Sequence, residues 1–319
     1  MKKVRIILIS LCMIILLVVF VSSISLAWTS DVPGMTPAKM LRLEMEKGTV
    51  VAPFCPNAIS AMVAEDIGFK AVYMTGGGVA AMRGFNDTGY VTQTEMAQNA
   101  KWMVDAVNIP VICDADTGYG NAMNLIRTIQ DYEAVGVAGC HIEDQVMPKK
   151  CGFFAGKEVV SLEEFVGKIK AAVYARKDPD FLIIARCDAL AITGWDDVVL
   201  RCRAYMEAGA DMIFVDGIKT LQDAEDYVTK LGDLPLFVIG NIATTQKIAE
   251  MGFKINICGG TNNVIPGAVW KTFRELMDTG TTTTDWWMTK DYPGSGPSGD
   301  LLGMTKYYEL EKEFTARGN

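Results

Sequence analysis

Short apolar runs alternate along the chain with longer segments in which apolar residues recur at helical spacing. Each run is apolar almost throughout and ends in polar residues. Such runs are typical of strands in a parallel sheet that is covered on both faces. The runs are residues 49–55, 71–77, 110–116, 139–145, 181–189, 212–217, 236–241 and 255–260. Eight strands alternating with helices predict a (β/α)8 barrel.

Glycine residues separate the predicted helices from the strands that follow. In four places the chain passes from a helix end through a glycine into a strand, which predicts a left-handed helix cap. These caps are Gly68, Gly136, Gly209 and Gly252. At the start of a helix, Ser161 and Glu164 have the spacing of a capping box, which predicts a helix over 161–177.

An open, doubly wound sheet is the alternative fold. Such sheets often bind dinucleotides through a G-x-G-x-x-G motif after the first strand. No such motif follows the first strand here, and Gly76, Gly77 and Gly78 are expected to form only a short glycine turn. We therefore favour the barrel.

The first residues form a targeting segment. Lys2, Lys3 and Arg5 precede an almost unbroken apolar run over 6–26. Residues 1–27 are expected to be a cleaved signal peptide or an uncleaved anchor, because about 20 apolar residues can span a bilayer. Either would place the rest of the chain outside the cytoplasm, secreted or anchored in the membrane by this segment alone. The barrel is then expected over 28–278.

Residues 279–319 are expected to be an extension of loops that leads to a last helix around 301–316. Within it, Trp286 and Trp287 are expected to cover a surface or a subunit contact. A length of 319 residues with half of them hydrophobic is enough for one large packed core.

Charge and cysteine content narrow the possible functions. The formal net charge of -8 argues against nucleic acid as a partner, because phosphate binding relies on clustered Lys and Arg. Outside the leader the cysteines form no CxxC pair, and several lie in apolar runs. Neither a disulfide framework nor a zinc site is therefore indicated.

Polar residues follow most of the predicted strands. In a barrel of this type the carboxyl ends of the strands meet at one mouth, where active sites lie. The residues at these ends are Thr75, Gly76, Gly77, Asp114, Asp116, His141, Glu143, Asp144, Arg186, Asp188, Asp216 and Asn241. Carboxylates this close together repel one another unless a cation joins them.

An all-oxygen set of ligands favours Mg²⁺, or Mn²⁺, over zinc. Asp114, Asp116 and Glu143 are the candidate ligands, directly or through water. The alternative is that some of these acids only cap the helices that follow.

A cationic loop follows Glu143. Lys149 and Lys150 lie next to Cys151, and nearby lysines make a thiol easier to ionise. Cys151 would then be fit for proton transfer or nucleophilic attack. The alternative is an inert loop cysteine.

Four motifs in this order resemble those of the isocitrate lyase and phosphoenolpyruvate mutase superfamily, most closely its methylisocitrate lyase branch. They are DADTGYGN from Asp114, HIEDQ from His141, PKKCG from Pro148 and ARCDAL from Ala185. The likeness covers residues 50–273. It implies a (β/α)8 barrel, an Mg²⁺ cofactor, and oligomers that exchange a C-terminal helix, so that a homodimer or homotetramer is expected.

The resemblance also implies a reaction, the retro-aldol cleavage of a 2-hydroxy di- or tricarboxylate. Cys151, with Lys149 beside it, would protonate the departing enolate. Arg186 would neutralise a substrate carboxylate, and His141 would orient the site. With 2-methylisocitrate the products would be pyruvate and succinate. The residues that the resemblance assigns to the substrate are Tyr73, Thr75, Gly76, Gly77, Asp87, Gly152, Asp216 and Asn241.

Three departures from the lyase pattern point to altered substrate recognition. Phe153 stands where the lyase loop has a histidine, and Asp216 stands where a glutamate is usual. The segment IATTQ after Asn241 lacks a glutamate that helps to bind the distal carboxylate. Two other functions therefore stay open. One is a phosphonate mutase or hydrolase, or an oxaloacetate hydrolase or decarboxylase. The other is a dicarboxylate-binding protein without catalysis.

Overall fold

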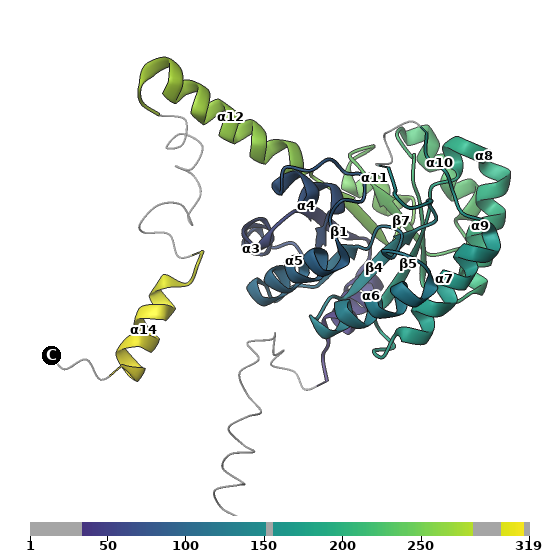
Figure 1. Ribbon diagram of the computed structural model, residues 1–319, viewed down its shortest axis with the longest axis horizontal. Helices are drawn as coiled ribbons and strands as arrows, with labels where there is room; N and C mark the ends of the chain where they lie inside the picture. Colours follow the sequence, from purple (N-terminus) through teal and green to yellow (C-terminus); the bar gives the residue numbers. More distant parts are fainter. Residues whose placement is uncertain (1–33, 151–155, 283–300, 316–319) are drawn as a thin grey trace, which may run out of the picture.

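Eight parallel strands close into a barrel in the computed structural model, which describes residues 34–150, 156–282 and 301–315. Each strand pairs with the next in sequence, and β8 closes the barrel against β1 (Figure 1). The strands are β1 (Val50–Cys55), β2 (Val72–Met74), β3 (Val111–Asp114), β4 (Gly139–Glu143), β5 (Leu182–Cys187), β6 (Met212–Val215), β7 (Leu236–Ile239) and β8 (Ile255–Cys258). Each predicted run contains one strand, so the predicted (β/α)8 barrel is confirmed.

Helices surround the barrel (Figure 1). They are α2 (Pro37–Lys47), α3 (Ala58–Ile67), α4 (Gly76–Met82), α5 (Gln93–Ala106), α6 (Ala122–Ala134), α7 (Leu162–Ala175), α8 (Leu190–Thr193), α9 (Trp195–Glu207), α10 (Leu221–Leu231) and α11 (Thr245–Glu250). The four glycines predicted to cap helices all have positive φ, from 88° at Gly136 to 104° at Gly209. A left-handed residue of this kind ends a helix at little steric cost when it is glycine.

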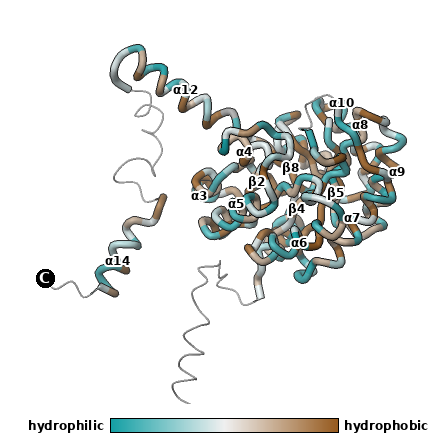
Figure 2. Tube along the Cα trace, in the orientation of Figure 1, coloured by the Kyte–Doolittle hydropathy of each residue, from teal (hydrophilic) through white to brown (hydrophobic). Residues whose placement is uncertain are grey.

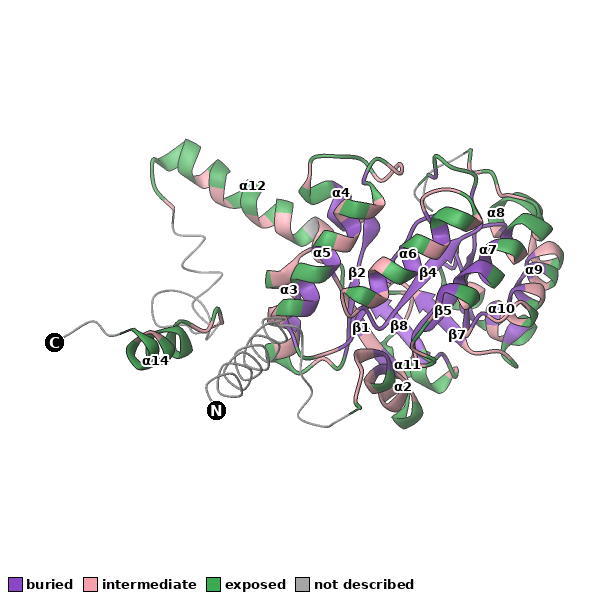
Figure 3. Ribbon diagram, turned by 60° about the horizontal axis from the view of Figure 1, so that its bottom comes forward, coloured by how far each residue is buried: buried purple, intermediate pink, exposed green. Residues whose placement is uncertain are grey.

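Successive side chains on each strand point alternately into the barrel and out toward the helices. On β5, Leu182 and Ile184 belong to a buried cluster that fills the barrel. Ile183 and Cys187 belong to the larger cluster between the strands and the helices. Figure 3 shows the strands buried and the outer helices exposed on one side only. This alternation decides which strand-end residues reach the mouth.

The predicted glycine turn at residues 76–78 is wrong, because these residues open helix α4. Thr75 caps the helix, and its Oγ1 accepts the Gly78 amide at 3.2 Å. Glycine is needed for close approach rather than for a turn. A Cβ on Gly76 would lie 2.5 Å from Asp114 Oδ2.

The helix predicted over 161–177 is α7, which ends at Ala175. Its cap is only half of the expected capping box. Ser161 Oγ accepts the Glu164 amide at 3.2 Å, and this satisfies one of the amides left free at the helix start.

Helix α12 (Thr261–Thr279) runs outward from the barrel (Figure 1). Apolar residues are scattered along it (Figure 2), and Trp270 and Met277 are 68% and 81% exposed. In the described ranges, no helix has the length and apolar character needed to span a bilayer. The predicted last helix is α14 (Met304–Phe314). The predicted leader, residues 1–27, and Trp286 and Trp287 lie outside the described residues.

Candidate active site

Inward-facing residues at the carboxyl ends of β3, β4 and β5 meet at the mouth of the barrel. Asp114 pairs in register with His141, and Glu143 pairs with Arg186. Asp144 is a correction to the sequence prediction, because it follows Glu143 and points outward. Its Oδ2 accepts the Tyr205 hydroxyl of α9 at 2.7 Å.

Three buried carboxylates form the acid side of the mouth, which we define as Asp114, Asp116 and Glu143. Asp116 has φ 45°, an uncommon value for a residue other than glycine. Asp114 Oδ1 accepts the Asp116 amide at 2.9 Å, and the Asp116 carbonyl accepts the Glu143 amide at 2.9 Å. Gly76 donates its amide to Asp114 Oδ2 at 3.2 Å. The backbone therefore holds these residues close to one another.

Burial raises the pKa of two of the three carboxylates on the acid side. It raises the pKa of Asp116 to about 6, against the opposing charge of Lys149. It also raises the pKa of Glu143 well above its ordinary value, although Arg186 and Lys149 favour the ionised form. For Asp114, His141 and Lys149 outweigh burial and lower the pKa. The cations near Asp116 and Glu143 are thus too few to offset the effect of burial on these two carboxylates.

The acid side fits a hard divalent cation that takes only one or two ligands from the protein and the others from water or substrate. Both carboxylate oxygens of Glu143 are buried and accept no hydrogen bond. Across the described part of the chain, no three His, Cys, Asp or Glu side chains are grouped closely enough to enclose an ion. Mg²⁺ suits such a site, because it usually takes one or two protein carboxylates and retains water or substrate oxygens.

Lys149 lies between the acid side and the loop after α4. Its side chain is 3% exposed and forms ion pairs with Asp87 and, at 2.9 Å, with Asp116 Oδ1. Burial lowers the pKa of Lys149, but Asp116 and Glu143 outweigh it and raise the pKa well above the ordinary value. Lys149 is therefore a protonated cation at the mouth. Asp87 also lies beside Gly77, where a Cβ would be 3.1 Å from its Oδ2.

Two cations and two carboxylates form the paired side of the mouth, which we define as Lys157, Arg186, Asp188 and Asp216. Arg186 donates from Nε and Nη2 to both carboxylate oxygens of Asp188, at 2.8 and 3.1 Å. Its Nη2 also lies 3.2 Å from Asp216 Oδ1, and its Nη1 lies 3.3 Å from Glu143 Oε2. The approach of Arg186 to Glu143 therefore joins the paired side to the acid side.

His141 lies below the carboxylates inside the barrel. Its Nε2 is 2.6 Å from the Tyr73 hydroxyl and 3.7 Å from Asp114 Oδ1. Burial lowers the pKa of His141 to about 4, so the ring is neutral near pH 7. A neutral ring between Tyr73 and Asp114 orients these groups and does not supply a charge.

The remaining predicted residues have different outcomes. Thr75 is buried at the start of α4, as described above. Asn241 is exposed, and its Oδ1 accepts the Gly259 amide at 3.1 Å. Cys151, Gly152 and Phe153 lie outside the described residues.

Sequence reasoning missed Lys157 and Gln145. Gln145 Nε2 donates to Asp188 Oδ1 at 3.0 Å. Gln145 shares the inward phase of His141 and Glu143, so strand alternation would have found it. Lys157 belongs to no strand, so strand alternation could not predict its place in the site.

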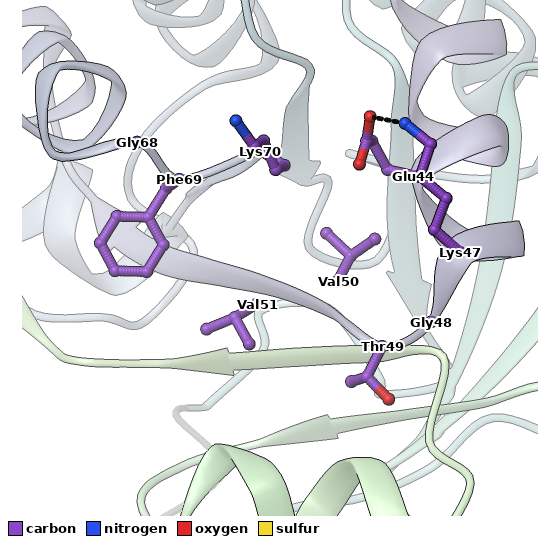
Figure 4. Close-up of a pocket in the computed structure, with 9 residues that line it drawn as sticks. All are labelled: Glu44, Lys47, Gly48, Thr49, Val50, Val51, Gly68, Phe69 and Lys70. Atoms are coloured by element: carbon purple, nitrogen blue, oxygen red, sulfur yellow. Dashed lines mark hydrogen bonds and ion pairs between the residues drawn. The ribbon is translucent and has the colours of Figure 1, made fainter.

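A pocket lies at the other end of the barrel (Figure 4). Its lining includes Thr49 and Val50 at the start of β1, and Lys70 just before β2. Lys47 at its edge is paired with Glu44 at 2.7 Å. Residues at this amino-terminal end generally serve stability, so we do not assign this pocket to the site.

The fold and the site together define the class: a (β/α)8-barrel protein with buried carboxylates at the carboxyl ends of its strands. A family model described as phosphoenolpyruvate phosphomutase matches residues 40–277. The 2,3-dimethylmalate lyase of Eubacterium barkeri is 38% identical over 299 residues, covering 88% of this chain and 98% of that protein. The 2-methylisocitrate lyase of Aeropyrum pernix is 38% identical over 256 residues, covering 78% and 82%. The chain therefore belongs to the phosphoenolpyruvate mutase/isocitrate lyase superfamily.

Solved structures agree with this assignment. An oxaloacetate acetylhydrolase in complex with 3,3-difluorooxalacetate matches with a TM-score of 0.79 and 32% identity, covering 87% of this chain and 97% of that one. A phosphonopyruvate hydrolase in complex with oxalate and Mg²⁺ matches with a TM-score of 0.76 and 31% identity, covering 88% and 99%. The superfamily thus includes lyases and hydrolases with names that refer to small carboxylates.

Proposed function

We propose that the protein is an Mg²⁺-dependent carbon–carbon lyase that cleaves a 2-hydroxy di- or tricarboxylate. The acid side carries the proposal, because backbone hydrogen bonds hold Asp114, Asp116 and Glu143 together and both carboxylate oxygens of Glu143 accept no hydrogen bond. The two relatives named as lyases support the reaction class. The hydrolase structure with bound Mg²⁺ supports the metal, and Mn²⁺ is a chemical substitute.

The acid side would hold the metal through one or two of its carboxylates, Asp114, Asp116 and Glu143, directly or through water. Bound Mg²⁺ would stabilise negative charge on the substrate hydroxyl oxygen and the adjacent carboxylate. Lys149 would add a fixed positive charge next to that oxygen. His141 and Tyr73 would hold Asp114 in place from below.

The bond cleavage needs a charge partner and a proton donor. As the hydroxyl passes its proton to a carboxylate of the acid side or to water, its carbon becomes a carbonyl. The electron pair of the carbon–carbon bond then passes to the departing fragment as an enolate. Arg186 would neutralise a carboxylate of the substrate. Cys151, outside the described residues, would give its thiol proton to the enolate carbon.

A hydrolase acting on oxaloacetate or a phosphonate is the second candidate. The two solved hydrolases of the superfamily favour it, since both match the whole barrel. The sequence KKCG after Pro148 favours the lyase, because it supplies a thiol that could protonate the departing enolate. A protein that binds dicarboxylates without turnover would need no proton donor at all.

Two further parts of the proposal concern assembly and location. We propose a homodimer or homotetramer, because helix α12 carries exposed apolar residues such as Trp270 and Phe273 away from the barrel. We also propose that residues 1–27 place the barrel outside the cytoplasm, which their apolar run supports.

Turnover of a substrate panel tests the proposed function. The protein lacking residues 1–27 would be assayed on 2-methylisocitrate, 2,3-dimethylmalate, isocitrate and oxaloacetate, with Mg²⁺, with Mn²⁺ and with EDTA. The products measured would be pyruvate from the first two substrates, glyoxylate from isocitrate, and oxalate or pyruvate from oxaloacetate. We expect metal-dependent release from at least one hydroxy acid, lost in Cys151→Ser. Turnover of oxaloacetate alone that survives Cys151→Ser would favour the hydrolase. Metal-dependent binding without turnover would favour the binding protein.

A further inference from the structure

Lys157 is a buried lysine that the proposed reaction does not use. It lies on the connection between β4 and α7, and its side chain is 5% exposed. Its Nζ lies 2.8 Å from Asp216 Oδ2 and 3.2 Å from Asp188 Oδ1. A buried ammonium held by two carboxylates costs free energy of desolvation unless its charge is well matched. The position of Lys157 therefore calls for an explanation.

Lys157 completes a closed ring of alternating charges with Arg186. Arg186 contacts the same two carboxylates, Asp188 at 2.8 Å and Asp216 at 3.2 Å. Lys157 contacts the other oxygen of Asp216 and one oxygen of Asp188. Two positive and two negative charges then balance inside the ring.

The ring leaves one edge of the Arg186 guanidinium for the site. Nε and Nη2 bind within the ring, whereas Nη1 lies 3.3 Å from Glu143 Oε2. The aromatic ring of Phe214 packs against one face of the guanidinium, with its centroid 5.0 Å from Arg186 Cζ. Without Lys157, Arg186 alone would face three carboxylates, and Asp188 and Asp216 would compete with Glu143 for it.

We propose that Lys157 is a positioning residue that keeps the Nη1 edge of Arg186 directed at Glu143 and at an incoming carboxylate. Lys157 shares the negative charge of Asp188 and Asp216 with Arg186, so the Nη1 edge of Arg186 stays available for other carboxylates. The step from Arg186 to a substrate carboxylate rests on the proposed function. The effect of Lys157 on the orientation of Arg186 does not.

Gln145 supports this assignment from the other leg of the same connection. Its Nε2 donates to Asp188 Oδ1 at 3.0 Å and to the Lys150 carbonyl at 2.9 Å. Its Oε1 accepts the Lys150 amide at 2.9 Å. Asp188 is therefore bound by two residues of this connection, the side-chain amide of Gln145 and the ammonium group of Lys157.

The first test is structural and does not depend on activity. Crystal structures of the full barrel would be compared for wild type, Lys157→Met and Lys157→Arg. We expect Lys157→Met to move the Arg186 guanidinium by about 1 Å or more away from Glu143, enough to weaken its contact with a carboxylate. Lys157→Arg should retain both ion pairs and the wild-type orientation. An unmoved guanidinium in Lys157→Met would overturn the proposal.

The second test separates positioning from simple stability. On the substrate that the panel identifies, Lys157→Met should raise KM by roughly 10- to 100-fold, as for residues that orient an active group. Its kcat should change by less than about threefold, because uniform binding is what is lost. Lys157→Arg should recover most of the KM. Lys170→Met, at an exposed position on α7, is the charge-matched control.

The outcomes of the two tests are distinguishable. A lower melting temperature with unchanged KM in Lys157→Met would show a structural role only and overturn the proposal. If wild type turns over no substrate of the panel, the proposed function fails, and the crystal structures still decide the role of Lys157. If Lys157→Met does not fold, Lys157→Gln, which keeps a polar group, replaces it in both tests.

Discussion

The acid side and the paired side of the mouth use the same residue types in opposite ways. On the acid side, Asp114, Asp116 and Glu143 share Lys149 and one edge of Arg186. On the paired side, two carboxylates and two cations balance within one ring. Buried charges that are matched can serve as scaffold, whereas carboxylates short of positive charge mark a place for a cation.

The largest expected effect comes from neutralising the acid side. Glu143→Gln keeps the shape of the side chain but replaces a carboxyl group whose oxygens accept no hydrogen bond and which is a candidate metal ligand. We expect metal-dependent turnover to fall by more than the ~100-fold typical of residues that only orient a ligand. We expect thermal stability without metal to stay equal or rise, because the group removed is one whose ionised form is disfavoured by burial. If Glu143→Gln had a lower melting temperature and full activity, Glu143 would be part of the scaffold and not of the metal site.

The opposite pattern is expected on the paired side. Asp188→Asn removes a charge that binds both Arg186 and Lys157. Breaking a buried ion network in this way should lower the free energy of unfolding by roughly 3 kcal/mol. Denaturant unfolding in the absence of metal measures this change, with Asp233→Asn, which loses an exposed pair with Arg203, as the control. Equal stabilities for the two variants would contradict the scaffold role.

A steric change sharpens the comparison without altering charge. Gly76→Ala would place a methyl group 2.5 Å from Asp114 Oδ2 and displace that carboxylate. We expect a loss of about 1–3 kcal/mol in stability, as for other overpacked sites, together with weaker metal binding. Gly167→Ala on α7 has open space around its Cβ and should be neutral or slightly stabilising. Wild-type metal affinity in Gly76→Ala would show that Asp114 does not contact the metal.

The smallest expected effect is a pH dependence from Asp116. Burial raises its folded pKa to about 6, above the ordinary carboxyl value. The folded state then holds this proton more tightly than the unfolded state, so its stabilising contribution is present in acid and is lost as pH rises toward 6. Without metal, the stability of wild type relative to Asp116→Asn should fall by on the order of 1 kcal/mol between pH 4 and 7. A difference that rises with pH would contradict the raised pKa.

Strand alternation explains how much of this site the sequence could predict. Runs that are apolar throughout predicted all eight strands, and their ends predicted the residues of the mouth. Counting alternate positions from His141 separates Glu143 and Gln145, which face inward, from Asp144, which contacts α9. Whether a residue at a strand end points into the barrel or toward the helices can therefore be predicted from its position in the alternation.

The paired side shows where such reasoning ends. Lys157 lies in a connection without strand register, and it reaches carboxylates 31 and 59 residues further along the chain. Only the closed barrel brings these groups together. The role of Gly76 and Gly77 escapes prediction for a related reason, since the side chains that a Cβ would meet, Asp114 and Asp87, come from other parts of the chain.

Manganese binding tests the central claim, that the acid side is the metal site and the paired side is not. Binding of Mn²⁺, which electron paramagnetic resonance detects, would be titrated in wild type, Glu143→Gln and Asp188→Asn at pH 7.5. The account predicts one bound ion in wild type, an affinity weakened by on the order of 100-fold in Glu143→Gln, and a much smaller change in folded Asp188→Asn. Unchanged affinity in Glu143→Gln, or a greater loss in Asp188→Asn, would contradict it.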